Sequence, residues 1–231
     1  MKVTIIHGSP RKGNTYRATQ IFKDELAKRG GIEFTELSMP QAIPEFCVGC
    51  QVCLGNPREK CPHERYVTPV LDAILDADAL IIGSPHYGAT SMPAGLKNFF
   101  DHLDFLTLTV APRAEMFRKK AFIITTGTGS KSVIRTIAGC LKNWGVNRVY
   151  STGFRMLTDK WDKLSEPKLA KVENSLKKKA GKFYLAKKRR PHLSTVFMYH
   201  ISKIILKNFA GAETYSYKYW DANDWFRKRP F

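Results

Sequence analysis

The sequence of 231 residues has no hydrophobic run long enough to cross a membrane, because it contains no stretch of about 18 consecutive apolar residues. Its first residues also lack the charged start, long apolar core and small-residue cleavage site of a secretory signal. The sequence therefore predicts a cytoplasmic protein with no membrane span. Thiols in that compartment stay mostly reduced, so clustered cysteines indicate metal or redox chemistry before disulfides.

Acidic residues are scarce: 20 Asp and Glu residues stand against 38 Lys and Arg residues, which gives a formal net charge of +18. Ten of the basic residues, but only one acidic residue, Glu173, fall in the late segment Lys168–Arg190. This balance suits anionic cofactors and substrates, and would permit weak contact with nucleic acid or an anionic surface. A basic interaction module is kept as a minor alternative, and nucleic acid is not an expected partner.

The loop Gly8–Thr15 is neither a Walker A loop nor a Gly-x-Gly-x-x-Gly loop. It follows an apolar run, residues 3–6, that predicts a buried strand, and precedes a segment with apolar residues on one helical face. Loop hydroxyls, backbone N–H groups and the dipole of the following helix favour an anion at such a turn. We therefore predict a phosphate site here; a plain turn in which Asn14 or Thr15 caps the helix is the alternative.

Apolar strands alternate with helical segments along the rest of the chain. The later strands are predicted at residues 32–37, 79–83, 121–126 and 146–154. This alternation predicts an α/β fold with a parallel, doubly wound sheet. Ligands bind such sheets beyond the carboxyl ends of the strands. Three loops rich in Gly, Ser and Thr fall at these ends, which strengthens the prediction of a phosphate-bearing ligand: Gly8–Thr15, Ser84–Ser91 and Thr126–Ser130.

Together these loops resemble the flavodoxin-like NAD(P)H-dependent FMN reductase family. The matching motifs are Gly8–Thr15, then Ser84-Pro85-His86-Tyr87 leading to Lys97-x-x-x-Asp101, then Thr126-Gly127-Thr128-Gly129. The resemblance covers residues 1 to 185. It implies a flavodoxin-like five-stranded parallel sheet in the order 2-1-3-4-5. It also implies an FMN cofactor that passes electrons from NAD(P)H, or from a reduced partner, to a quinone, a flavin or another acceptor.

The resemblance assigns a role to each loop. The first would hold the FMN phosphate, the second would lie along the ribityl chain and the ring, and the third would contact the other edge of the ring. In that order the residues are Ser9, Arg11, Gly13, Asn14 and Thr15; Ser84, Pro85, His86, Tyr87 and Gly88; Thr126, Gly127, Thr128 and Gly129. The first loop is shorter than the usual family form, which leaves the places of Lys12 and Gly13 in the cradle open.

No residue need act as a nucleophile, because the flavin carries the redox chemistry. His86 and Tyr87 are the candidates for direct contact with flavin or substrate, and an exposed loop position is the alternative for His86.

Four of the five cysteines form the compact motif Cys47-x2-Cys50-x2-Cys53-x7-Cys61-Pro62. This spacing resembles the ligation of a [4Fe–4S] cluster in ferredoxins. Within the family it is similar to the iron-sulfur flavoproteins, which implies an electron carrier as the alternative function. A zinc site and reduced thiols without metal both remain open. Cys140 lies in an apolar helical stripe, which predicts a thiol in the core.

Residues 191–231 extend beyond the predicted flavodoxin-like FMN-binding domain of residues 1–190. Apolar residues between positions 196 and 206 predict a short helix, and a set of aromatic residues follows: Tyr215, Tyr217, Tyr219, Trp220, Trp225, Phe226 and Phe231. Exposing so many aromatic rings would be costly, so we expect them to pack on the core or across a dimer interface. The resemblance likewise implies a homodimer or higher homo-oligomer, with a small-molecule acceptor or a redox protein as partner.

Overall fold

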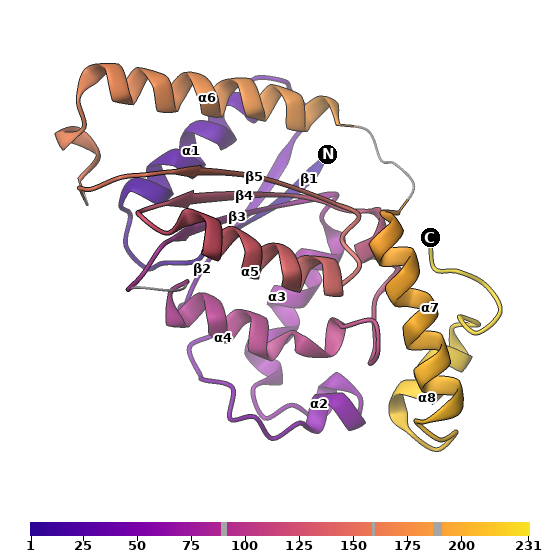
Figure 1. The fold of residues 1–231 in the computed structure, drawn as a ribbon. Helices are drawn as coiled ribbons and strands as arrows, with labels where there is room; N and C mark the ends of the chain where they lie inside the picture. Colours follow the sequence, from indigo (N-terminus) through magenta and orange to yellow (C-terminus); the bar gives the residue numbers. More distant parts are fainter. Residues whose placement is uncertain (89–91, 159, 187–190) are drawn as a thin grey trace.

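A five-stranded parallel sheet forms the centre of the molecule (Figure 1). The computed structural model describes residues 1–88, 92–158, 160–186 and 191–231. The strands lie in the order β2-β1-β3-β4-β5, and each neighbouring pair is parallel. Their bounds are Lys2–His7 for β1, Glu33–Ser38 for β2, Ala79–Pro85 for β3, Lys120–Thr126 for β4 and Arg148–Phe154 for β5. This confirms the predicted flavodoxin-like sheet.

Helices cover both faces of the sheet (Figure 1). Helices α1 (Asn14–Ala27) and α6 (Glu166–Leu185) pack on one face. Helices α3 (Glu64–Asp76), α4 (Ala94–His102) and α5 (Ser130–Asn143) pack on the other. Strands β1, β3 and β4 are therefore buried along nearly their whole length, which is why their sequences are continuously apolar rather than alternating.

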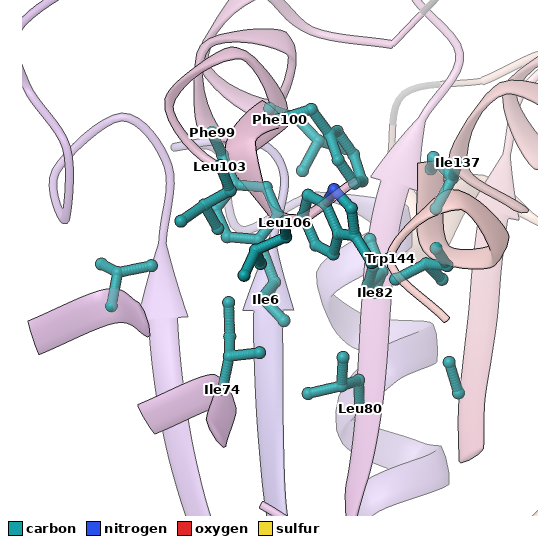
Figure 2. Packing of buried hydrophobic residues seen from close by; sticks show 14 of the residues in the cluster. Ile6, Ile74, Leu80, Ile82, Phe99, Phe100, Leu103, Leu106, Ile137 and Trp144 are labelled. Carbon is teal, nitrogen blue, oxygen red and sulfur yellow. The ribbon is translucent and has the colours of Figure 1, made fainter. Parts of the chain in front are cut away.

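The larger core layer is built around Trp144, where α5 ends (Figure 2). Its ring lies 5.2 Å from the Phe100 ring and 5.9 Å from the Phe99 ring, measured between centroids. The next residue, Gly145, has a φ of +90°, and a Cβ there would lie 2.6 Å from the Phe117 ring. The turn that ends α5 therefore needs glycine.

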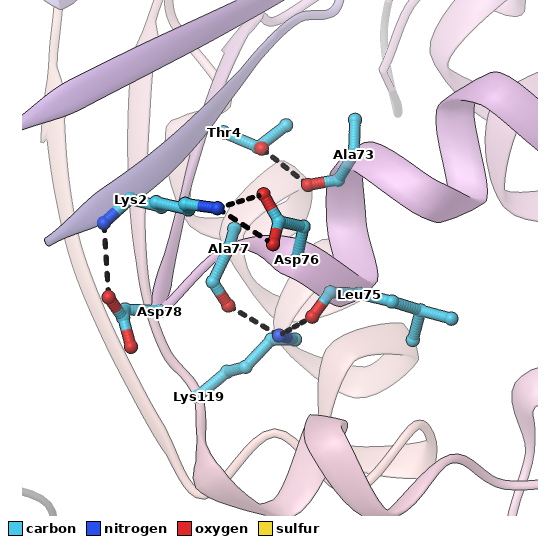
Figure 3. A network of polar contacts seen from close by, with 8 residues as sticks. All are labelled: Lys2, Thr4, Ala73, Leu75, Asp76, Ala77, Asp78 and Lys119. Atoms are coloured by element: carbon cyan, nitrogen blue, oxygen red, sulfur yellow. Dashed lines mark hydrogen bonds and ion pairs between the residues drawn. The ribbon is translucent and has the colours of Figure 1, made fainter.

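A polar network fixes the amino ends of the strands to the last turn of α3 (Figure 3). The Lys119 ammonium donates to the carbonyl oxygens of Leu75 (2.7 Å) and Ala77. Lys2 pairs with Asp76 at 2.9 Å. Lys119 thereby satisfies carbonyls at the end of α3 and complements the helix dipole, whereas Lys2 pairs with the Asp76 carboxylate. The carboxyl ends of the strands are at the opposite edge.

Residues 191–231 form a separate helical layer at one side of the sheet (Figure 1). Helices α7 (Leu193–Asn208) and α8 (Tyr215–Ala222) enclose a third apolar cluster, in which the Tyr199 and Trp220 rings stack at 5.4 Å. Trp225 and Phe231 pack on Phe117 of the main body. The predicted boundary at residues 190 and 191 lies at a stretch, 187–190, outside the described residues.

The remaining helical segments are short. Helix α2 spans Val52–Gly55, and 3₁₀ turns span Arg58–Lys60, Asp104–Leu106, Ala114–Arg118 and Trp161–Lys163. Among the described residues, no helix combines the length and the apolar character that crossing a bilayer would require.

Candidate functional site

A cavity of about 270 Å³ opens at the carboxyl ends of β1, β3 and β4. All three predicted loops contribute to its lining. The predicted residues that line it are Ser9, Arg11, Gly13, Asn14, Thr15, Pro85, His86, Tyr87, Thr126 and Gly127. The parallel sheet brings these segments together because each follows a strand that ends at the same edge.

Four predicted residues do not line the cavity, and three of them lie directly behind it. Ser84 is fully buried, and its hydroxyl donates to the carbonyl of Pro85 at 3.0 Å. Thr128 and Gly129 lie beneath the His86 ring. Gly88 is exposed, with a φ of +59°. Residues 89–91, the rest of the predicted second loop, are outside the described part of the chain.

The first turn of α1 faces the cavity without a side-chain cap. Its N-cap is Gly13, which has no side chain to bond the first N–H groups of the helix. Asn14 and Thr15 are inside the helix, so the alternative in which one of them caps it is wrong. Free N–H groups and the positive end of the helix dipole therefore face a cavity that Arg11 also lines.

Hydrogen bonds tie the first loop to the other segments around the cavity. The hydroxyls of Thr15 and Thr126 are 2.6 Å apart, and the Asn14 amide donates to the carbonyl of Thr158 at 2.7 Å. The Ser9 hydroxyl lies 3.3 Å from the Tyr87 hydroxyl. Of the two residues whose places the sequence left open, Gly13 lines the cavity and Lys12 does not.

His86 contacts the third loop, residues 126–130, through hydrogen bonds and close packing. Its backbone N–H donates to the carbonyl of Thr126 at 2.9 Å, and its Nδ1 lies 3.5 Å from the Thr128 hydroxyl. A Cβ at Gly127 would lie 2.9 Å from the His86 Cβ, and one at Gly129 would overlap the imidazole. His86 is half-buried rather than an exposed loop residue, and its buried Nε2 has no partner among the described residues.

The sequence analysis missed the segment after β5. Met156, Leu157 and Thr158 line the cavity, and Leu157 has an exposed fraction of 77%. No motif marks these residues, and the only available signal was that β5 ends at the same sheet edge. His7 and Tyr16 were also missed, although both adjoin the predicted first loop.

A polar cluster behind the cavity joins the buried His7 side chain to the partly exposed side chains of Glu36 and Lys23. His7 Nε2 lies 2.6 Å from a carboxylate oxygen of Glu36, and the Lys23 ammonium lies 2.5 Å from the other. Burial would raise the pKa of Glu36, but hydrogen bonds from Lys23, His7 and Gln20 outweigh it and lower the pKa to about 2. Glu36 therefore stays ionised and orients the His7 ring at the cavity wall.

Helix α4 holds both ends of the cysteine segment, residues 47–61. Asn98 accepts the N–H of Cys47 at 2.8 Å, and its amide donates to the carbonyls of Ile43 (3.2 Å) and Glu45 (2.9 Å). One turn later, His102 Nε2 lies 2.9 Å from Nδ1 of His63, two residues beyond Cys61. Both α4 side chains are buried. The same helix follows the second cavity loop, so it links the two features.

The four predicted ligands Cys47, Cys50, Cys53 and Cys61 are free thiols in one neighbourhood. Burial, and then the proximity of the other three thiols, raises the pKa of Cys53 to about 11. Over the described ranges, the side chains do not already form a group of three or more in metal-binding geometry. Cys140 is half-buried against the larger core layer, and burial raises the pKa of its thiol.

Comparison with known proteins gives consistent similarities. The model of a family described as NADPH-dependent FMN reductase matches residues 1–152. An iron-sulfur flavoprotein of Clostridioides difficile is 28% identical over 230 residues, which is 94% of this chain and 95% of that protein. Another, of Methanocaldococcus jannaschii, is 36% identical over 104 residues, which is 44% of this chain and 51% of that protein.

Two solved structures share the fold. An NAD(P)H:quinone oxidoreductase from Methanothermobacter marburgensis superimposes with a TM-score of 0.60 at 16% identity, over 80% of this chain and 98% of that chain. The apo form of an NADH:FMN oxidoreductase gives a TM-score of 0.55 at 19% identity, over 84% of this chain and 92% of that chain. These similarities establish the flavodoxin-like architecture.

Proposed function

Because the chain belongs to the NADPH-dependent FMN reductase family, we propose that the cavity at the carboxyl ends of β1, β3 and β4 is its FMN site. The protein is an FMN-dependent oxidoreductase with NAD(P)H as substrate. The observation that carries the proposed location is the uncapped first turn of α1, which faces a cavity lined by all three predicted loops. A phosphate is the natural partner of such a helix start.

The residues present fit FMN. The N–H groups at the start of α1, the Ser9 hydroxyl and the Arg11 guanidinium provide donors for the phosphate. The Tyr87 and Leu157 side chains provide apolar surface for a planar ring, and the unpartnered Nε2 of His86 provides a polar contact. Bound FMN would supply hydride and one-electron chemistry, while these residues bind and orient it.

Substrates can reach the proposed flavin position from the solvent-exposed side of the cavity. Tyr87 and Leu157, at 42% and 77% exposure, leave apolar surface open to solvent beside the proposed flavin position. A nicotinamide or quinone ring stacks on surfaces of this kind. We propose that NAD(P)H and a small acceptor such as a quinone or a flavin use this side in turn.

The test is steady-state turnover of the FMN-loaded protein. NADH or NADPH oxidation is followed at saturating FMN with a soluble quinone as acceptor. We expect turnover that depends on added FMN, and Gly129→Ala, which displaces His86, is expected to reduce it. FMN binding without any oxidation of NADH or NADPH would reject the enzymatic part of the proposal.

The cysteine segment supports a second candidate function, an iron-sulfur flavoprotein that acts as an electron carrier. Four cysteine thiols are the ligands that a [4Fe–4S] cluster requires. They lie near one another, since Cys47, Cys50 and Cys61 each raise the pKa of Cys53. Relatives named iron-sulfur flavoproteins support this candidate. Cys47, Cys50, Cys53 and Cys61 would hold a [4Fe–4S] cluster, which would supply one-electron transfer to the flavin site.

Anaerobic purification, followed by metal and sulfide analysis, tests whether the protein is an iron-sulfur flavoprotein. Iron and acid-labile sulfide in amounts near four per chain, with broad absorbance in the visible blue, are expected if the cluster forms. Cys50→Ser should lose the iron, whereas Cys140→Ser, outside the segment, should retain it. Stoichiometric zinc, or no metal, would instead favour one of the alternatives left open by the spacing.

We further propose a homodimer or higher homo-oligomer. Helix α7 exposes Leu193, Phe197 and Ile204, large apolar residues that a second copy would cover. Light scattering tests this proposal, because a monomer at micromolar concentration would contradict it. The cytoplasmic location stays a prediction of the sequence.

A further inference from the structure

A second cavity, of about 890 Å³, lies at the other end of strand β5 from the proposed flavin site. It is bounded by the end of α5, the beginning of β5, the end of α6 and the beginning of α7 (Figure 1). Arg148 begins β5, and Phe154 ends it beside Gly127 of the flavin-side loop. Six residue steps along a strand span roughly 20 Å. The second cavity is therefore separate from the FMN and nicotinamide site.

The lining of this cavity is basic. Lys142 lies on α5, Arg148 on β5 and Lys182 on α6, and His192 is the N-cap of α7. The described lining contains no Asp or Glu. None of these four side chains forms an ion pair with another described residue. Positive charge gathered in a concave surface without a counter-charge favours an anionic ligand.

Stabilisation of helix ends does not account for this charge. The carbonyls at the end of α6 are already occupied by Lys120, whose ammonium donates to Phe183 (2.6 Å), Tyr184 (3.1 Å) and Ala186 (3.0 Å). Lys182 is therefore not needed as a cap. Arg148 projects from a strand, and its buried Nε has no acceptor within the described residues. A buried N–H without a partner costs folding free energy, which an anion in the cavity would recover.

His192 adds a further hydrogen-bond donor to the lining. Its Nδ1 accepts the backbone N–H of Ser194 at 3.2 Å, so the proton of the neutral ring is on Nε2. Protonation of the ring is not required for it to donate to an anion.

The apolar part of the lining indicates what the anion is attached to. The Tyr150 ring is 37% exposed, and Val149 and Leu185 lie beside it in the cavity wall. A planar ring packs on an exposed tyrosine face, and a guanidinium binds phosphate through paired hydrogen bonds. The volume is that of an ordinary small-molecule site. We propose that this cavity binds a nucleoside diphosphate, with the phosphates at Arg148 and Lys182 and the base at Tyr150.

The test is calorimetric titration of ADP, and separately of pyrophosphate, into the full-length protein at saturating FMN. We expect ADP to bind more tightly than pyrophosphate, because only ADP has a ring to place on Tyr150. Arg148→Gln and Lys182→Gln should each weaken ADP binding at least tenfold. Lys171→Gln is the matched control, since Lys171 is an exposed α6 lysine outside the cavity.

Three results would overturn the proposal. The first is no ADP binding to the wild-type protein. The second is an equal loss in Lys171→Gln, which would show attraction to overall positive charge. The third is a loss in Ser9→Ala but none in Lys182→Gln, which would place ADP in the flavin cavity. If Arg148→Gln does not fold, Lys142→Gln, a change at an exposed helix end, replaces it with the same expected weakening.

Discussion

Replacing Asn98 with alanine should release the cysteine segment from α4. Asn98 is 3% exposed and makes three hydrogen bonds, of 2.8, 2.9 and 3.2 Å, to the backbone of residues 43–47. Each such bond contributes about 1 kcal/mol net, and its loss leaves a backbone group of the segment without its partner. We therefore expect Asn98→Ala to destabilise the closed position of the segment by about 3 kcal/mol.

Thiol labelling measures this local effect. Cys53 is half-buried with a raised pKa, so it should react slowly with a disulfide reagent while the segment is closed. A destabilisation of about 3 kcal/mol corresponds to labelling up to about 100-fold faster, where opening limits access to the thiol. The matched control is Asn174→Ala, the same change at an exposed position of α6. It should leave the labelling rate within about twofold of the wild type, because surface changes are worth little.

Equal labelling rates for Asn98→Ala, Asn174→Ala and the wild type would refute this reasoning. Such a result would mean that α4 does not hold the segment, and that the packing of Cys53 on the core is sufficient to hold it. Urea unfolding of the same proteins separates local release from global loss of stability. A large shift of the midpoint with an unchanged labelling rate in native buffer would also contradict the local account.

Three further predictions concern single positions. Gly129→Ala should weaken FMN binding at least tenfold by displacing His86, whereas Gly139→Ala, with open space around the new methyl group, should leave it unchanged in a fluorescence titration. Lys119→Met should lower the free energy of unfolding by about 2 kcal/mol in urea, because two helix-end carbonyls lose their donor; an unchanged midpoint would contradict this. Glu36 has a pKa of about 2, below its ordinary 4.5. Its ionised form therefore contributes fully to the free energy of unfolding above pH 4.5, and this contribution disappears as the pH falls toward 2. Glu36→Gln should therefore be less stable than the wild type at pH 7, by about 1 kcal/mol after solvent screening, and the difference should vanish near pH 2.

The sheet could be predicted because burial on both faces leaves a simple pattern. The run at residues 79–83 is apolar throughout, and the structure extends that strand to Pro85, where it still pairs with Thr126. The edge strand β2 alternates instead, and its observed start, Glu33, falls within a residue of the predicted one. Strand order followed from the family resemblance rather than from these patterns.

The residues that line the cavity could be predicted from the sequence only where they belong to a loop with a recognisable motif. The hydroxyl contact between Thr15 and Thr126 joins residues 111 positions apart in the chain, and neither local sequence indicates it. Leu157 and Thr158 follow β5 without any glycine-rich pattern, so only the sheet topology places them at the cavity. Asn98 is a single amide in an apolar helical stripe, and its role depends on where the cysteine segment crosses α4.

The most direct test of the central claim, that the start of α1 binds the FMN phosphate, is a comparison of FMN and riboflavin affinities by calorimetry. The two ligands differ only in the phosphate group. Free N–H groups at a helix start, together with Arg11, should contribute about 3 kcal/mol to FMN binding through charge-assisted hydrogen bonds. The account predicts that FMN binds about 100-fold more tightly than riboflavin. Equal affinities, or no binding of FMN at all, would contradict it.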